Sequence, residues 1–204
     1  LSIGLRPQTG ASWGSGLIDL SLSESELLGK LNRRWKRALR KVSNFGVTVK
    51  LEEITSSRLD EVLDIYTDLQ HRNNFNGINS HLIEVLSKLQ SKDWACNLFV
   101  ASRLDEENEL EELGYRLCIH HGNTVTDFVV STNEKGRQTE ANVALYWYAI
   151  LHAKSIGCDW FDLGGLSEVT TPKGIAEFKK GLNSDLYELA GEWRKYTVPF
   201  FSQR

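Results

Sequence analysis

Apolar residues recur along the chain with the two spacings typical of an α/β protein. Helical spacing marks four segments, at residues 23–44, 57–70, 80–89 and 140–155. Short alternating or continuous apolar runs predict strands at 17–20, 47–51, 97–102, 113–121, 124–131 and 159–163, and a last alternating stretch covers 185–198. A short helix is predicted over 172–181, between the last two of these. This order predicts an α/β fold, built as a mixed sheet with helices on both faces.

Local signals mark where several elements begin and end. Ser23 and Glu26 have the spacing of a capping box, and Gly122-Asn123 is a favoured tight turn between two strands. Pro172 suits the first turn of a helix, and Gly181 is expected to end that helix in the left-handed conformation. Residues 1–15 are rich in Gly, Ser and Thr and lack periodicity, so we expect a tail or linker there and a single domain over 16–204.

Composition narrows the class of protein. A chain of 204 residues suits one domain, and a formal charge of −3 excludes a globally basic nucleic-acid binder but not a local basic face. No apolar run is long enough for a membrane span and no signal peptide opens the sequence, so we expect a cytoplasmic protein. The chain contains no Met, so we expect Leu1 to be an internal or processed position.

The three cysteines are expected to be reduced core thiols. They are odd in number and far apart, and they match neither a zinc spacing nor a secreted disulfide framework. The histidines show no ligand spacing either, so we expect no metal site. No Gly-x-Ser-x-Gly sequence is present, which argues against a serine nucleophile of the hydrolase type.

The helix predicted at 23–44 carries a dense basic face. Seven cations crowd a short span without an acid among them: Lys30, Arg33, Arg34, Lys36, Arg37, Arg40 and Lys41. Like charges four residues apart repel by a few tenths of a kcal/mol per pair, so an anionic ligand or nearby acidic side chains would stabilise this face. An ordinary solvated face is the other interpretation. Arg37, Arg40 and Lys41 are therefore candidates for substrate binding.

Candidate site residues follow the predicted strand at 159–163. That strand ends at Gly164-Gly165, and open α/β sheets tend to bind ligands in loops beyond strand ends. Lys179 is the candidate cation on the helix that follows. A polar loop, Gly136 to Thr139, precedes another helix and is expected to offer free backbone N–H groups to an anion, with Arg137 beside it.

Three segments together resemble the Fem family, the FemA/FemX-type peptidoglycan bridge aminoacyltransferases. The first reads Trp35-Lys36-Arg37-Ala38-Leu39-Arg40-Lys41-Val42 and continues into Gly46-Val47-Thr48-Val49. The second runs from Tyr146-Trp147 through Lys154 and Gly157 to Phe161-Asp162-Leu163-Gly164-Gly165. The third is Phe178-Lys179-Lys180-Gly181. They occur in the family's order over about residues 16 to 198.

The resemblance implies a fold of the GCN5-related acetyltransferase (GNAT) type, corresponding to the second of the two domains of a Fem enzyme. It implies an acyltransferase that moves an amino acid from aminoacyl-tRNA to an amine acceptor such as a peptidoglycan precursor, which can be lipid-linked, without a bound cofactor. By analogy, Lys179 would stabilise the oxyanion or the tRNA 3′ end and Phe178 would shape the pocket. Trp147 and Asp162 are further candidates for substrate binding.

Two questions stay open at this stage. Asp162, His120 or His121 could remove the proton from the attacking amine, although a structural role suits all three as well. The donor could instead be an acyl-CoA, in a GNAT N-acyltransferase of envelope or polysaccharide assembly. Residues 134–142 lack the glycine-rich pyrophosphate turn usual in such enzymes, because Gly136 is the only glycine there. A non-catalytic GNAT-like binding domain is the third alternative.

Overall fold

A computed structural model describes residues 5–7, 13–75, 77–166, 171–191 and 193–195. Its helices are α1 (Glu24–Lys30), α2 (Arg33–Asn44), α3 (Ser56–Asn73), α4 (Ser80–Lys88), α5 (Glu134–Gln138), α6 (Ala141–Ser155) and α7 (Lys173–Lys180). Its strands are β1 (Leu5–Pro7), β2 (Gly14–Asp19), β3 (Thr48–Glu52), β4 (Trp94–Leu104), β5 (Leu110–His121), β6 (Thr124–Thr132), β7 (Trp160–Asp162), β8 (Asp185–Glu188) and β9 (Trp193–Lys195).

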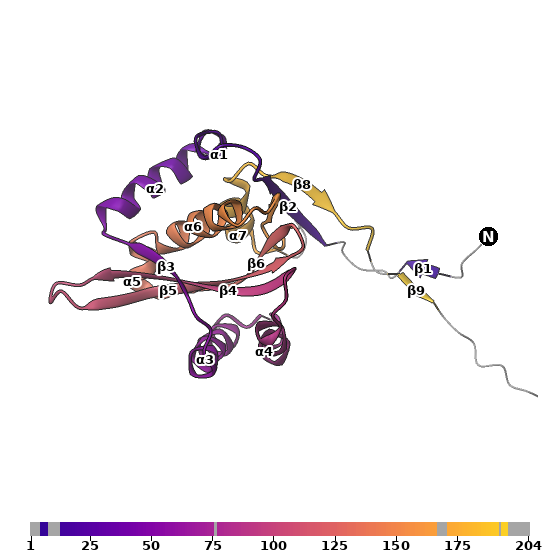
Figure 1. Cartoon of the computed structure of the whole chain (residues 1–204), viewed down its shortest axis with the longest axis horizontal. Helices are drawn as coiled ribbons and strands as arrows, with labels where there is room; N and C mark the ends of the chain where they lie inside the picture. The colour runs from indigo at the N-terminus through magenta and orange to yellow at the C-terminus, as the bar shows by residue number, and fades with distance from the viewer. Residues whose placement is uncertain (1–4, 8–12, 76, 167–170, 192, 196–204) are drawn as a thin grey trace, which may run out of the picture.

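One seven-stranded sheet, in the order β3-β4-β5-β6-β7-β2-β8, organises the fold. Its neighbouring strands are antiparallel except for β6 and β7, which run parallel with α6 as the crossover between them. Helices α1, α2, α6 and α7 cover one face and α3 and α4 cover the other (Figure 1). The predicted mixed α/β sheet with helices on both faces is confirmed.

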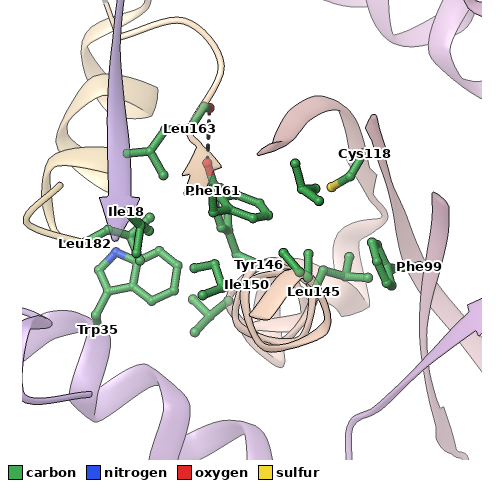
Figure 2. Packing of buried hydrophobic residues seen from close by; sticks show 14 of the residues in the cluster. Ile18, Trp35, Phe99, Cys118, Leu145, Tyr146, Ile150, Phe161, Leu163 and Leu182 are labelled. Atoms are coloured by element: carbon green, nitrogen blue, oxygen red, sulfur yellow. Dashed lines mark hydrogen bonds between the residues drawn. The ribbon is translucent and has the colours of Figure 1, made fainter. Parts of the chain in front are cut away.

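The core on the α6 side is built around large aromatic side chains. Trp35 of α2 meets the edge of Tyr146 of α6, with ring centroids 5.8 Å apart, and Phe161 of β7 lies 5.7 Å from the same ring (Figure 2). The Tyr146 hydroxyl donates a hydrogen bond of 3.1 Å to the carbonyl of Leu163. The chain beyond β7 is therefore tied to the middle of α6.

The predicted helix over 23–44 is in fact two helices. The Ser23–Glu26 capping box is present, but α1 ends at Leu31, whose extended backbone (ψ 141°) breaks the helix. Asn32 then caps α2 through its side chain, which accepts from the Trp35 N–H at 2.9 Å, while its own N–H donates to the Gly181 carbonyl. The break docks the start of α2 against the end of α7, a contact that the continuous apolar stripe could not indicate.

Gly181 differs from its prediction. Its φ is −67°, so the left-handed ending expected for α7 is wrong. Its lack of a side chain serves close packing instead, because a Cβ there would lie 2.5 Å from Cδ1 of Trp35. Pro172 lies at the N-cap, one residue before the first turn where it was expected. In α4 the cap is Asn79, one residue before the predicted start at residue 80.

The expected tail contains regular structure. Gly14 and Ser15 begin β2, and Leu5–Pro7 pairs with β9 in a two-stranded ribbon that stands apart from the main sheet in Figure 1. The tail or linker expected over 1–15 therefore contains strand residues at these positions, because they pair with strands far along the chain. The final predicted strand, 185–198, is divided into β8 and β9, and residues 196–198 lie outside the described part. No helix among the described residues is long and apolar enough to cross a bilayer.

Candidate active site

The candidate site lies where β6 and β7 separate. Strand β7 pairs with β6 only along Thr124–Thr126, although β6 continues to Thr132. Beyond Asp162 the chain follows β2 instead, with Leu163 N–H donating to the Gly16 carbonyl at 2.9 Å. Gly164 and Gly165 make this turn with φ of +57° and +63°, a left-handed conformation that favours glycine. The parallel pair therefore opens after three residues.

A pocket of about 380 Å³ occupies this opening. Six elements or loops contribute its walls: α2, α6 and α7 on one face of the sheet, strands β5 and β6, and the loop after β7. The lining residues are Arg34, Arg116, Asp127, Phe128, Val130, Asn142, Tyr146, Gly164, Gly174, Ile175, Phe178 and Lys179. The lining combines apolar surface with three cations and a carboxylate, a mixture that suits a small polar group held on an otherwise apolar wall.

Lys179 is buried at this wall, with 8% of its surface exposed. Its ammonium donates to the carbonyls of Leu163, at 2.6 Å, and of Gly164. It lies 3.4 Å from the Gly165 carbonyl and 3.4 Å from Oδ2 of Asp127. Burial lowers the pKa of Lys179, and the charge of Asp127 opposes that shift. Lys179 thus secures the turn that opens the pocket and presents a positive charge to it.

A buried ion pair stands behind Lys179. Arg116 of β5, 1% exposed, donates to Oδ1 of Asp127 on β6 and to the side-chain oxygen of Asn142 at 2.6 Å. Its guanidinium also lies 3.8 Å from the centroid of the Tyr146 ring. Sequence reasoning missed this group. The available signal was a single charge at the centre of each of two neighbouring strands, Arg116 within residues 113–119 and Asp127 within 124–132, a pattern that indicates a buried pair.

Phe178 forms the apolar side of the pocket. Its ring lies 4.7 Å from Trp35 and 6.0 Å from Tyr146, measured between centroids. The Trp35 indole N–H donates to its carbonyl at 2.8 Å. Because Gly181 permits Trp35 to approach α7 this closely, the α2–α7 contact fixes where both Phe178 and Lys179 lie.

Comparison with known proteins identifies the family. The model of the FemAB family matches residues 98–203, just over half of the chain. The chain belongs to the FemAB family. The resemblance on which the sequence analysis rested is thereby confirmed. A search of curated protein sequences found no match.

Solved structures agree on the fold of this FemAB-family chain. It superposes on the structure of FemX with a TM-score of 0.78 and 14% identity, covering 94% of this chain and 66% of that one. The C-terminal domain of a putative lysylphosphatidylglycerol synthetase from Agrobacterium fabrum gives 0.59 at 15% identity, covering 91% and 60%. L-PGS from Bacillus licheniformis gives 0.57 at 15%, covering 91% and 61%. The chain therefore spans about two thirds or less of each of these structures.

The other predicted residues of this FemAB-family chain lie outside the pocket lining. The Asp162 carboxylate accepts from Ser15 Oγ at 2.5 Å, from the Gly164 N–H at 2.8 Å and from the Tyr187 hydroxyl at 2.6 Å. These bonds give it a structural role in joining β7 to β2 and β8. His120 and His121 lie at the turn of the β5–β6 hairpin, where their ring nitrogens contact Gly122 O and Thr126 Oγ1.

Trp147 and Arg137 also face away from the pocket. Trp147 packs against the α6-side core and lines a small crevice beneath α1, together with Leu27 and Leu31. Arg137 donates to the Thr132 carbonyl at 2.9 Å and lines a separate open hollow of about 800 Å³ between α3 and α5.

The loop expected to offer free N–H groups from Gly136 to Thr139 is instead mostly the short helix α5. The Gly136 N–H donates to Oδ1 of Asn133 at 2.7 Å, and the N–H groups of Arg137 and Thr139 donate to Asn133 and Lys135 carbonyls. The prediction of an anion-binding loop is therefore wrong, because its donors are used within the helix and its cap.

The basic face of α2 reaches the pocket through Arg34. Arg37, Arg40 and Lys41 are exposed and do not line it. Lys41 lies 3.9 Å from Glu140, and Arg40 donates from Nε to the Lys36 carbonyl at 3.2 Å. Arg34, Arg37 and Lys41 follow helical spacing, so they form one stripe leading away from the pocket. Among the described residues, no three His, Cys, Asp or Glu side chains are grouped to hold a metal.

Proposed function

We propose that this chain transfers an aminoacyl group from aminoacyl-tRNA to an amine acceptor, such as a peptidoglycan precursor, in the pocket between β6 and β7. One observation supports this most directly: in a chain of the FemAB family, a buried lysine ammonium lies at the wall of a pocket formed where two parallel strands open. FemX, with the same fold over this chain, is the family relative that the proposal follows.

In the proposed reaction the acceptor amine attacks the carbonyl carbon of the aminoacyl ester. A C–N bond forms, the ester C–O bond breaks, and the proton lost by the amine ends on the departing ribose hydroxyl. The tetrahedral intermediate carries a negative oxygen, which a fixed cation in a site shielded from water stabilises by about 3–4 kcal/mol, or about 10²–10³ in rate. Lys179 is that cation.

The hydrogen bonds of Lys179 leave one N–H available for this role. An ammonium has three donors. Two are directed to the carbonyls of Leu163 and Gly164, and the third meets only the two longer contacts of 3.4 Å, to Gly165 O and Asp127 Oδ2. A developing oxyanion at a normal hydrogen-bond distance would compete well for that third donor. Phe178 would exclude water beside it.

The basic stripe of α2 supports a polyanionic donor. Arg34 lies at the pocket, and Arg37 and Lys41 continue from it along exposed helix surface. Phosphates of an RNA 3′ strand would meet these side chains while the aminoacyl end entered the pocket. An acyl-CoA donor fits less well, because the N–H groups of Gly136, Arg137 and Thr139, which lie before α6, are bonded within α5 and its cap.

The test is transfer by the full-length gene product, supplied with charged tRNA or with acetyl-CoA and with a peptidoglycan precursor as acceptor. Lys179→Met should lower kcat about 10²–10³-fold. Lys173→Met, at the exposed start of the same helix, should leave kcat within about twofold, as surface substitutions usually do. Thermal unfolding of each variant separates loss of catalysis from loss of folding, since Lys179→Met leaves three carbonyls without their donor.

Three results would overturn the proposal. Unchanged turnover in folded Lys179→Met would remove this lysine from the chemistry. Transfer from acetyl-CoA but not from charged tRNA would replace the donor, and binding of neither donor to the full-length protein would favour a non-catalytic binding domain.

A further inference from the structure

We propose that Asp127 is a positioning residue for the transfer: its carboxylate, clamped by Arg116, holds the Lys179 side chain at the wall of the pocket. This inference rests on the proposed function and extends it to residues that act through Lys179. It starts from the ion pair of Arg116 and Asp127 in the buried wall of the pocket, which the reaction as described above does not use.

The two oxygens of Asp127 serve two different cations. Oδ1 accepts from Nη1 of Arg116, and Oδ2 lies 3.4 Å from the Lys179 ammonium. The carboxylate is 8% exposed, so water cannot replace either partner readily. Because Arg116 holds one oxygen of the carboxylate, the other oxygen attracts Lys179 from a fixed direction.

A β-bulge helps to place Asp127. In the β5–β6 ladder Leu117 is opposite Val129 but Cys118 is opposite Asp127, so Phe128 is an extra residue on β6. Bulges bend a strand and redirect the neighbouring side chains. Here Asp127 faces Arg116 and α6, while Phe128 packs against the core on the α3 side.

Arg116 is itself held from two further directions. Nη2 donates to Asn142 on α6 at 2.6 Å, and the guanidinium carbon lies over the Tyr146 ring, 3.8 Å from its centroid. Its Nε is buried without a hydrogen-bond partner, so the Asp127 and Asn142 contacts carry its polar anchoring. Since Arg116 is fixed by α6, Asp127 cannot follow Lys179 if that lysine moves, and it acts as a stationary anchor.

The charges around Lys179 show why this anchor matters. Asp127 of β6 and Asp162 of β7 favour the charged ammonium, whereas burial and the positive charge of Arg116 on β5 lower the pKa of Lys179. Arg34 of α2 adds another cation to the same pocket, and Tyr146 of α6 and Cys118 of β5 are the other titratable groups nearby. Asp127 is the carboxylate in the pocket lining, so its loss would leave three lining cations without an anion.

The experiment compares Asp127→Asn with Arg116→Gln, which should act in opposite directions. The first removes the group that favours charged Lys179, and the second removes one that disfavours it. We expect the pKa of Lys179 to fall by about 1–3 units in Asp127→Asn, the usual effect of one close opposite charge, and to rise in Arg116→Gln. Proton NMR titration with ¹⁵N-labelled lysine measures this in the resting protein. Asp64→Asn, exposed on α3, is the control.

The same variants are then followed through transfer. In Asp127→Asn the alkaline limb of the kcat profile should move to lower pH by the same amount as the Lys179 titration, with the donor KM unchanged. Asp127→Glu restores the charge but moves it by one methylene, so the Lys179 titration should return while kcat stays low by up to about 10²-fold, the cost expected when a catalytic group is misplaced by about 1 Å. If Asp127→Asn does not fold, the kcat of Asp127→Glu still tests the positioning role.

The outcomes separate the two proposals. An unchanged Lys179 titration in folded Asp127→Asn, or kcat of Asp127→Glu equal to that of the wild type, would overturn the positioning role. Loss of kcat without any movement of the pH profile would show a merely structural effect and would also overturn it. No transfer by the wild type would overturn the proposed function, while the titration would still decide whether Asp127 holds Lys179.

Discussion

Gly164 is the position where a single methyl group should most directly damage the site. Its φ of +57° is left-handed, and a Cβ built there would overlap the carbonyl oxygen of Asp127. That oxygen belongs to β6 backbone, which cannot move aside as a flexible side chain can. Gly164→Ala must therefore push the turn away from β6, and its own carbonyl, which accepts from Lys179, moves with it.

Two costs add at this position. A non-glycine residue in the left-handed region costs about 1–2 kcal/mol. Overpacking a site that has no free space adds about 1–3 kcal/mol. We therefore expect Gly164→Ala to lower the free energy of unfolding by about 2–5 kcal/mol, a large part of the roughly 5–15 kcal/mol that stabilises a typical domain.

Gly46→Ala separates the two costs. Gly46 has a similar φ of +65°, but a Cβ there would meet no atom within 4 Å. It should lose only the backbone part, about 1–2 kcal/mol. Urea unfolding curves of the two variants measure both losses of free energy, and the dependence of that free energy on urea concentration is compared between the variants. Equal losses for the two alanine variants would show that the β6–β7 opening has room at Gly164, and the close approach described here would be refuted.

Three further predictions concern the surroundings of the pocket. Trp35→Phe removes the donor to the Phe178 carbonyl and should lower the free energy of unfolding by about 1–3 kcal/mol; an unchanged urea midpoint would contradict this. Burial and nearby His120 lower the pKa of His152 below 6.5, so as pH falls the unfolded chain binds a proton at this side chain before the folded protein does. The free energy of unfolding should therefore fall as pH drops below about 6.5, and it should fall less in His152→Gln. Superimposable profiles of stability against pH for the two proteins would refute this prediction. Arg37→Ala with Lys41→Ala should reduce the slope of log affinity for RNA against log salt by about 2, and an unaltered slope would exclude these side chains from phosphate contact.

Most of the sheet could be predicted from local pattern. The β5–β6 hairpin around Gly122-Asn123 and strand β7 with its glycine pair follow from turn residues and short apolar runs, which act over a few positions. The division of the first helix at Leu31 could not be predicted, because its cause is the contact of Asn32 with Gly181, far along the chain. Strand β1 escaped prediction for the same reason, since its partner is β9.

For the site, likewise, the sequence could not predict which of two neighbouring residues faces the pocket. Lys179 and Phe178 do line the pocket, but on α6 the sequence favoured Trp147 whereas its neighbour Tyr146 faces the pocket. Helix α6 is apolar on nearly all sides, so periodicity could not tell which of two adjacent aromatics points toward the opening between the strands. On α2, similarly, many cations share one face, so the sequence could not show that Arg34 alone among them lines this pocket.

The position of β2 has a consequence for how the protein folds during its synthesis. Although β2 lies near the start of the chain, its neighbours are β7 and β8, and Ser15 bonds to Asp162, 147 positions later. On the ribosome, residues 14–19 would have to remain without their sheet partners until residues 160–188 had emerged. Such distant pairing slows folding and leaves an unpaired strand available to other chains meanwhile. Ribosome-bound nascent chains that stop before β7 should accordingly be the species most dependent on chaperones.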